Sequence, residues 1–397
     1  MNLPSLAILI PIYKEKERLL KQNYEVFSRL KYSGKLQVYW LLHESDKETI
    51  EIVKRINDKF KVIIDDLNPP LKANALNNAL KHLKEEIVAV FDVDNVFSLD
   101  YIEKGVRLLL RFSDRNVVLT QGPRSFYNAD VNWLTRWQQL GVGWDEYHHK
   151  SKCCGLDKPH WWYMFGYAKD GSMDECNIGP WFGVSGTGYF VPKKVLEEVG
   201  GWSQSLTEDM DLSIKLYAKG KRMLVFSYPW QYEEAPETII NYLRQQARWR
   251  KGWVKDAMNY NVKVNFPNIW HFFRELRWWY VTYSLVFLSF VLGVTSLPTI
   301  IRLPLWTALF LGGTVLCGFL SVLLLVVILP YLIETQYRPN FSKIYGFLNM
   351  AQWILWGALT LKGWLEIKIG FKPLGWYRTK KRGIFNLMEF LRRLIGK

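Results

Sequence analysis

The first 260 residues alternate between short apolar runs and longer amphipathic stretches. The apolar runs predict β-strands at Leu6–Ile12, Gln37–Leu42, Lys61–Ile64, Ile87–Phe91 and Val117–Gln121. The amphipathic stretches between them predict helices at Lys16–Leu30, Lys47–Asp58, Ala73–Lys84 and Leu99–Arg111. Strand–helix alternation is typical of an α/β domain with a mostly parallel sheet and helices on both faces. Ligands of such sheets bind beyond the carboxyl ends of the strands, so the residues that follow each strand are the candidates for chemistry.

The pattern changes near residue 278, where long segments carry no charge. Trp279–Leu297 and Leu303–Ile333 are uncharged, and so is Ile344–Leu361, which includes Asn349, Gln352 and Thr360. At 1.5 Å per residue the first segment reaches about 28 Å, close to the ~30 Å of a hydrocarbon core. We therefore expect a small α-helical transmembrane domain of about three helices rather than buried helices of a soluble protein. The third segment either spans the bilayer or packs as a partly buried helix.

Charge is concentrated beside these segments. The chain has 52 Lys and Arg against 37 Asp and Glu, a net charge of +15. The tail Lys368–Lys397 holds nine basic residues and one acidic residue, a net charge of +8, and its apolar residues can form one helix face. A basic amphipathic tail next to membrane segments favours anionic headgroups over nucleic acid as its partner. Basic tails are usually cytoplasmic, yet three crossings after a cytoplasmic N-terminal domain would place this tail outside the cell. Either the third segment does not cross the bilayer, or the long second segment contains two crossings.

These features divide the chain into four parts. We expect a cytoplasmic catalytic domain over residues 1–265 and an interfacial helix over 266–278, where aromatic and charged residues alternate. A transmembrane region over 279–366 and a basic amphipathic tail over 367–397 follow. Residues 1–12 lack the basic start and the small-residue cleavage site of a signal peptide. Four cysteines (Cys153, Cys154, Cys176 and Cys317) are too few for a disulfide scaffold and indicate a reducing compartment. The predicted location is the cell membrane, with several crossings.

Two acidic clusters stand out in the catalytic domain. Asp92 and Asp94 lie one residue apart directly after the fourth predicted strand, where two carboxylates can share Mn²⁺ or Mg²⁺. An ordinary acidic turn is the alternative. Thr207-Glu208-Asp209-Met210-Asp211 stands at a predicted helix start, where carboxylates also serve as helix caps. Neither cluster alone specifies a function.

The order of the motifs is more specific than any one of them. Along the chain come Ile10-Pro11-Ile12-Tyr13-Lys14-Glu15, Lys72-Ala73-Asn74, Asp92-Val93-Asp94, Gly186-Thr187-Gly188-Tyr189-Phe190, Thr207-Glu208-Asp209 and Gln245-x-x-Arg248-Trp249. Over residues 5–255 this resembles glycosyltransferase family 2, in the membrane-bound branch of cellulose and hyaluronan synthases and polyprenyl-phosphate sugar transferases. A looser likeness covers Trp376-Tyr377-Arg378-Thr379-Lys380. The resemblance implies a GT-A-type nucleotide-sugar-binding domain.

The resemblance also implies a binding role for individual residues. Pro11, Tyr13 and Glu15 match the first-strand motif that cradles the nucleotide, with Lys14 where Asn is common. Glu44 and Asp46 stand at the end of the second strand, where the family usually has an Asp pair. Lys72 matches a lysine near the nucleotide.

Other matches imply catalysis. Asp92 and Asp94 match the metal-binding pair, with Asp94 the more direct ligand. Asp209, next to Glu208, matches the catalytic base. Gln245, Arg248 and Trp249 match the motif that holds the diphosphate and frames the acceptor.

The implied function is inverting, metal-dependent transfer of a hexose from a nucleotide sugar, with GDP-mannose ahead of UDP-glucose. A cation with Arg248 and Lys72 stabilises the leaving diphosphate. Three membrane segments do not easily enclose a polar glycan, so we expect a lipid-carrier acceptor, a dolichyl or polyprenyl phosphate or a glycan on such a carrier. A processive synthase of the cellulose or hyaluronan type using a UDP-sugar is the alternative, and an inactive membrane-tethered nucleotide-sugar-binding protein is a second one. The oligomeric state stays open.

An aromatic insert separates the metal pair from the base. Residues Tyr127–Pro180 include His148, His149, Cys153, Cys154, His160 and Cys176. Their spacing matches no standard structural zinc pattern, so we expect a lid with ordinary Cys and His rather than a zinc site.

Overall fold

The computed structural model describes residues 3–139, 178–179, 184–226, 230–259, 291, 343–370, 381 and 383. It divides the chain into two compact units. The first contains Met1–Tyr242 together with Arg378–Lys397, and the second contains Leu243–Tyr377. The described part of the first unit holds the predicted strands and helices.

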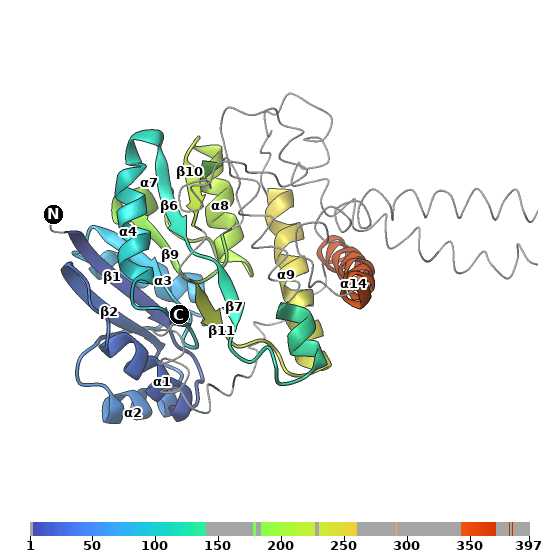
Figure 1. Cartoon of the computed structure of the whole chain (residues 1–397), viewed down its shortest axis with the longest axis horizontal. Coiled ribbons are helices and arrows are strands. Elements are labelled where there is room, and N and C mark those ends of the chain that lie inside the picture. The colour runs from blue at the N-terminus through green and yellow to red at the C-terminus, as the bar shows by residue number, and fades with distance from the viewer. Residues whose placement is uncertain are drawn as a thin grey trace, which may run out of the picture. The chain divides into compact units, whose positions relative to one another are not determined.

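An eight-stranded sheet forms the centre of the first unit (Figure 1), in the order β3-β2-β1-β4-β9-β6-β10-β8. Its strands are β1 (Leu3–Pro11), β2 (Gly34–His43), β3 (Lys61–Asp65), β4 (Ile87–Val90), β6 (Val117–Gln121), β8 (Ile178–Gly179), β9 (Tyr189–Pro192) and β10 (Arg222–Val225). Pairs β1–β2, β1–β4, β2–β3 and β6–β10 are parallel, whereas β9 runs antiparallel to both β4 and β6. The mostly parallel sheet predicted from the sequence is confirmed, with all five predicted strands in it.

Helices cover both faces of this sheet. They are α1 (Glu17–Ser28), α2 (Lys47–Ile56), α3 (Lys72–His82), α4 (Tyr101–Arg111), α7 (Lys193–Glu198) and α8 (Glu208–Ala218). Leu6, Ile8 and Ile10 of β1 share one core with apolar residues of α1, α2 and α4. The alternate residues Ala7 and Leu9 are fully buried too, and α3 lies against β1, β2 and β3. Because strand side chains alternate between faces, burial of both sets requires cover on both sides.

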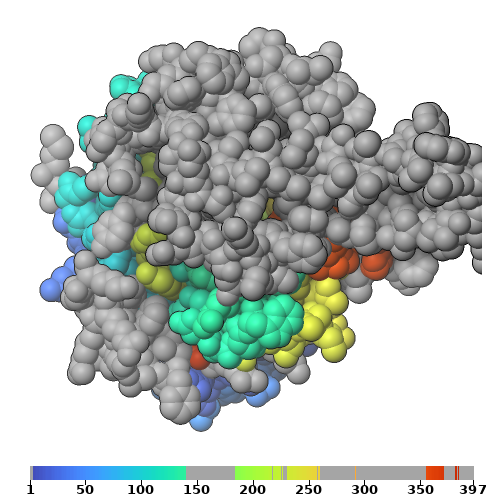
Figure 2. Space-filling view, turned by 45° about the vertical axis from the view of Figure 1, so that its right-hand side comes forward, coloured from blue at the N-terminus to red at the C-terminus, as the bar shows by residue number. Residues whose placement is uncertain are grey.

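A small second sheet supports the chain after β4. It consists of β5 (Val96–Phe97), β11 (Gln231–Glu233) and β7 (Arg124–Phe126), with β11 in the middle. Beyond β7, Asn128, Asn132 and Gln138 donate their side-chain amides to backbone carbonyls of residues 235–237 at 2.8–3.0 Å. Figure 2 shows the segment after β7, in blue-green, at the surface, where the Trp133 side chain is 60% exposed. These contacts hold the chain in place as it leaves β11.

The second unit contributes most of α9 (Ile239–Asn259) and all of α14 (Lys343–Lys368). The two helices contact each other within this unit, because Lys251 Nζ lies 2.7 Å from Glu366 Oε2 and Arg250 Cζ lies 4.0 Å from the Trp356 ring centroid. The third uncharged segment, Ile344–Leu361, lies within α14. In the part of the chain that the structure describes, we find no helix with both the length and the hydropathy needed to cross a bilayer.

Several predictions fall on other residues. The interfacial helix 266–278 and, except for Val291, the segments Trp279–Leu297 and Leu303–Ile333 lie outside the described residues. So do Trp376–Lys380, the tail apart from 368–370, 381 and 383, and the His and Cys residues of the insert. These expectations stay predictions.

Candidate active site

The carboxyl ends of β1, β2, β3 and β4 meet at one edge of the sheet because these strands are parallel. Because β9 runs antiparallel to β4, the loop that precedes β9 lies at the same edge of the sheet. Gly188 marks that arrival: its N–H donates to Val90 O at 2.7 Å, and its φ is +71°. A Cβ at Gly188 would lie 2.0 Å from Gln231 Oε1, so only glycine fits. The loop before β9 is thereby fixed beside the residues after β4.

The Asp92–Asn95 turn after β4 is tied to this loop. The Asp92 N–H donates to Asn95 Oδ1 at 2.7 Å and to Thr187 Oγ1 at 2.9 Å. Thr187 Oγ1 also donates to Asn95 Oδ1, and Asn95 N–H closes the turn on Asp92 O at 3.1 Å. Gln121, at the end of β6, donates to the carbonyls of Ser185 and Thr187. The backbone around the two aspartates is therefore fixed by hydrogen bonds on both sides.

Lys72 joins three elements at this edge. As the first residue of α3 it extends Nζ to Asp92 Oδ1 at 2.8 Å and to Gly186 O at 2.6 Å. Glu208 Oε1, at the start of α8, lies 3.3 Å away. Burial alone would lower the pKa of Lys72, but the Asp92 and Glu208 carboxylates outweigh it and raise that pKa. Lys72 is thus a fixed cation in the site.

Asp209 lies beside the same lysine. A Cβ placed on Gly186 would be 3.2 Å from Asp209 Oδ2, 3.4 Å from Lys72 Nζ and 3.5 Å from Glu208 Oε1. Gly186 therefore marks a point that all three side chains approach, and the absence of a side chain there leaves room between them. The structure brings Lys72, Asp92, Glu208 and Asp209 together, although they are up to 137 positions apart in the sequence.

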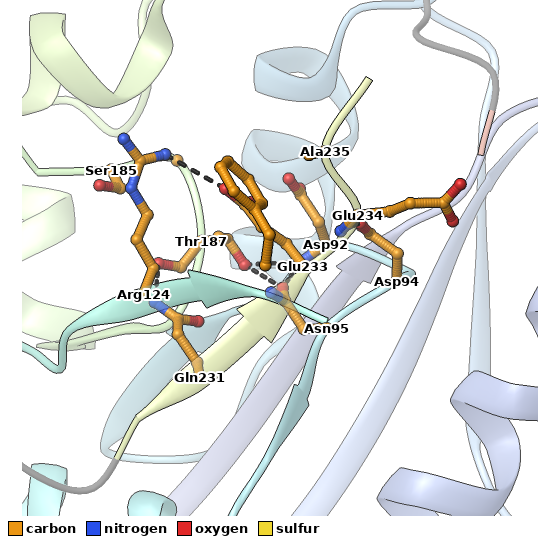
Figure 3. Close-up of polar contacts among 12 residues, drawn as sticks. Asp92, Asp94, Asn95, Arg124, Ser185, Thr187, Gln231, Glu233, Glu234 and Ala235 are labelled. Carbon is orange, nitrogen blue, oxygen red and sulfur yellow. Dashed lines mark hydrogen bonds and ion pairs between the residues drawn. The ribbon is translucent and has the colours of Figure 1, made fainter. Parts of the chain in front are cut away.

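Asp94 faces a different group of residues, which Figure 3 shows. It is fully buried, its Oδ2 accepts the Glu234 N–H at 2.8 Å, and its Oδ1 pairs with Lys381 Nζ. The neighbouring Glu233 lies 3.3 Å from Arg124 Nη1. Burial raises the pKa of Glu233; Arg124 opposes this effect, and Asp94 adds to it. The second sheet places these groups, because β5 directly follows the aspartate turn and pairs with β11.

Glu233, Glu234 and Lys381 were missed by the sequence predictions. The adjacent pair Glu233-Glu234, which ends 11 positions before the Gln245-x-x-Arg248-Trp249 motif, is a visible signal, and Lys381 directly follows the Trp376–Lys380 likeness. Neither pattern by itself places these side chains near Asp94, because that proximity arises only from strand pairing and from the return of the C-terminal segment.

The residues expected at the nucleotide divide into buried and exposed members. Pro11 ends β1, and Tyr13 and Glu15 follow it as half-buried residues. Asp46 is buried; it accepts the Lys14 N–H, and it caps α2 by accepting the Thr49 N–H at 3.3 Å. Glu44 is exposed. Of the two candidates at the end of β2, Asp46 thus shapes the loop backbone, while the Glu44 side chain faces solvent.

The buried His43 is a further feature of this end of the site. Its ring meets that of Tyr13 edge to face at 6.0 Å, and its nitrogens lie 2.7 Å from Ser45 Oγ and 3.2 Å from Leu67 O. Lys14 adopts a positive φ of 55° and carries its ammonium 5.1 Å from the Tyr13 ring centroid. Tyr13, which directly follows the first strand and Ile12, thus packs edge to face on the buried His43.

Gln245, Arg248 and Trp249 lie on α9 within the second unit. They share one continuous helix, where positions three and four apart lie on the same face. Their roles at the diphosphate and acceptor stay predictions.

The donor set fits Mn²⁺ or Mg²⁺ bound by few protein ligands. Asp92 and Asp94 offer hard carboxylate oxygens, and each already faces one ammonium group, Lys72 or Lys381. Within the described ranges, no cluster of three or more His, Cys, Asp or Glu side chains could enclose a metal ion. An ion held by one or two carboxylates and completed by substrate phosphates matches this arrangement.

Comparisons with known proteins agree with this geometry. The model described as "Glycosyl transferase family 2" matches residues 7–173, and the one described as "Glycosyl transferase family group 2" matches residues 159–337. Among curated relatives, a probable glucomannan 4-beta-mannosyltransferase 14 of Arabidopsis thaliana is 26% identical over 79% of this chain. This chain spans only 59% of that relative's length. A probable glycosyltransferase YdaM of Bacillus subtilis is 23% identical over 96% of this chain and 87% of its own length.

A solved structure of another protein illustrates the shared fold. It is a mannosyltransferase, PcManGT from Pyrobaculum calidifontis, in complex with GDP-Man and Mn²⁺. The TM-score is 0.53 at 15% identity, over 93% of this chain and 88% of that one. The α/β GT-A-like fold with a mostly parallel sheet is therefore common to both proteins.

Proposed function

Because this chain belongs to glycosyltransferase family 2, we propose that it is an inverting, metal-dependent enzyme that transfers mannose from GDP-mannose to a lipid-carrier acceptor. The observation that carries the proposal is the convergence of Lys72, Asp92, Glu208 and Asp209 around Gly186. The choice of donor is supported by the solved mannosyltransferase with GDP-Man and by the mannosyltransferase names among the relatives.

The donor diphosphate is negatively charged and gains charge as the glycosidic bond breaks. A divalent cation held by Asp92 and Asp94, when bound, supplies electrostatic stabilisation of that charge. Lys72 adds a permanent positive charge, because its hydrogen bonds to Asp92 and Gly186 O fix the ammonium in place. Preorganised charges of this kind cost little reorganisation during the reaction.

Asp209 is the proposed base for a hydroxyl acceptor. Its side chain approaches Gly186 from the start of α8, and its own backbone position is fixed at a helix N-terminus. A positioned general base typically contributes ~10²–10⁴-fold to the rate. A phosphate acceptor needs this proton transfer much less, because its second pKa lies near 6 and the oxygen is already anionic.

The sequence prediction of few membrane helices in the uncharged segments between 279 and 333 supports lipid-carrier transfer, because enclosing a polar polymer needs more. The enzyme is accordingly proposed to act at the cell membrane, with its catalytic unit on the cytoplasmic side. A second candidate is synthesis of a β-mannan-type polymer, which the glucomannan mannosyltransferase names among the relatives favour.

Product analysis separates the two candidates. The full chain is incubated with Mn²⁺, vesicles containing polyprenyl phosphate, and radiolabelled GDP-mannose or UDP-glucose. We expect label from GDP-mannose in a short glycoside that organic solvent extracts, and no such label with the Asp94→Asn variant. Label in a solvent-insoluble polymer would support the second candidate, and no metal-dependent transfer from either donor would contradict both.

A further inference from the structure

The C-terminal segment returns to the acidic site at two adjacent points. Lys381 Nζ pairs with Asp94 Oδ1, and the Gly383 N–H donates to Glu234 Oε2 at 2.7 Å. The Lys381 side chain is 17% exposed, and Asp94 is not exposed at all. Lys381 and Asp94 are 287 positions apart, so the contact reflects tertiary structure and not sequence proximity.

The two acceptors, Asp94 and Glu234, are joined by a hydrogen bond. The Glu234 N–H donates to Asp94 Oδ2 at 2.8 Å, and the Tyr127 hydroxyl donates to Glu234 Oε2 at 2.9 Å. Gly383 has a φ of +78°, and a Cβ there would lie 2.8 Å from Gln22 Oε1. The left-handed backbone favours glycine at this position, next to the Glu234 carboxylate.

Charge explains why Lys381 lies there. A buried carboxylate without a cation is strongly unfavourable, and Lys381 supplies the cation for Asp94. A divalent cation bound at Asp94 would face this ammonium across one carboxylate. Two cations so close repel each other in a site with little water.

We infer that Lys381 and the divalent cation compete for Asp94, so that binding of the metal displaces Lys381 and releases the Gly383 N–H from Glu234. The inference rests on the proposed function for its metal ion. The seated segment is then an autoinhibitory contact, because Asp94 accepts a metal ion only after Lys381 has left.

The first test measures Mn²⁺ binding without nucleotide, from the EPR signal of free Mn²⁺ in solutions of the full chain. Lys381→Met should bind Mn²⁺ about tenfold more tightly than wild type if the seated arrangement holds about nine molecules in ten. Lys219→Met is the matched control, because it removes the same charge from a side chain that is 49% exposed and 4.0 Å from Glu198. Unchanged or weaker binding by Lys381→Met overturns the inference.

A second variant keeps the charge. Gly383→Ala keeps the Lys381 side chain but should weaken the binding of residue 383 to Glu234, because an L side chain is strained at a φ of +78°, and it too should tighten Mn²⁺ binding several-fold. Because this variant leaves a cation for Asp94, it answers the question even if Lys381→Met does not fold. Mn²⁺ affinity equal to that of wild type again overturns the inference.

Hydrogen exchange follows the release itself. In wild type, the peptide that contains Gly383 should exchange at least about tenfold faster after Mn²⁺ is added, because its N–H loses Glu234 as acceptor. Unchanged or slower exchange in a Mn²⁺-saturated sample means that metal and Lys381 occupy the site together, and it overturns the inference. Both tests use the metal alone. Failure of sugar transfer with successful Mn²⁺-induced release would contradict the proposed function and leave the competition intact.

Discussion

Replacing Lys72 by methionine tests whether this residue binds the donor or only supports the fold. Lys72 Nζ contacts Asp92 Oδ1, Gly186 O and Glu208 Oε1 within 3.3 Å. Methionine fills similar space without charge or hydrogen bonds. Lys215 offers a matched control, because its Nζ also contacts one carboxylate and one glycine carbonyl: it lies 3.1 Å from both Asp211 Oδ2 and Gly201 O.

The expected loss of stability follows from burial. Removing one partner of a buried ion pair costs about 3–5 kcal/mol. The Lys72 and Glu208 side chains are 13% and 10% exposed, but Asp92 is 34% exposed, so water relieves part of the unpaired charge. We therefore expect Lys72→Met to lower the free energy of unfolding by about 2–3 kcal/mol, with a fall in Tm of about 4–12 °C. Lys215→Met should cost about as much.

Donor affinity separates the two variants. A hydrogen bond from a charged group contributes about 1.5–3 kcal/mol, so Lys72→Met should weaken GDP binding in Mn²⁺ by about 10–150-fold. Lys215→Met should bind GDP like wild type. Urea unfolding and calorimetric titration give both quantities.

The pH dependence has a defined sign. The raised pKa of Lys72 means that its stabilisation is fully present below the unfolded lysine pKa of about 10.4 and is lost only as pH rises through the higher folded value. The ionisation of Lys72 therefore adds no pH dependence between pH 6 and 9. If both variants lose stability equally and both keep wild-type affinity for GDP, Lys72 is a structural residue and the proposed donor role is wrong.

Three further changes test other parts of the site. Asp209→Asn should lower kcat by ~10²–10⁴-fold if the acceptor is a hydroxyl and by less than about tenfold if it is a phosphate, as initial rates with each acceptor would show. Gly188→Ala should destabilise the protein by about 2–5 kcal/mol, because the new Cβ combines a left-handed φ with steric overlap on Gln231. In urea unfolding, the double variant Gly188→Ala with Gln231→Ala should recover the part of the loss that comes from the overlap. Equal stability of the single and double variants would contradict this account. Mn²⁺ with GDP at 100 times Kd should stabilise wild type by about 2.7 kcal/mol in thermal unfolding, and Asp94→Asn should abolish the shift.

The elements that the sequence predicts correctly are those with a clear local pattern of apolar positions. The apolar runs that predict β1 and β2 extend over nine and ten residues in the structure, and the amphipathic stretch after β1 becomes α1. The strands of the second sheet, β5, β7 and β11, have only two or three residues each and give no such pattern. In β11 the residues Gln231, Tyr232 and Glu233 show no apolar alternation, and the strand exists because β5 and β7 pair with it on both sides.

In the candidate site, too, some features follow from local sequence and others only from the fold. Asp92, Asp94, Glu208 and Asp209 could be found from the sequence, because acidic residues directly after a strand or at a helix start are visible in one dimension. The pairing of Asp94 with Lys381 could not be predicted from the sequence, because the two residues are 287 positions apart. The exposed position of Glu44 and the capping role of Asp46 also depend on how the loop after β2 turns.

The amino-acid sequence by itself determined the strand–helix order, the uncharged segments and the order of the acidic, lysine and arginine motifs, because each is a local property of consecutive residues. Only the tertiary structure decided which charges meet. Because β9 pairs antiparallel with β4, the loop before β9 places Gly186 at the carboxyl edge of the sheet. Glu234, the residue after β11, lies within hydrogen-bonding distance of Asp94. Pairing between distant segments depends on the whole folded chain, since each contact gains its energy only after both partners have been placed.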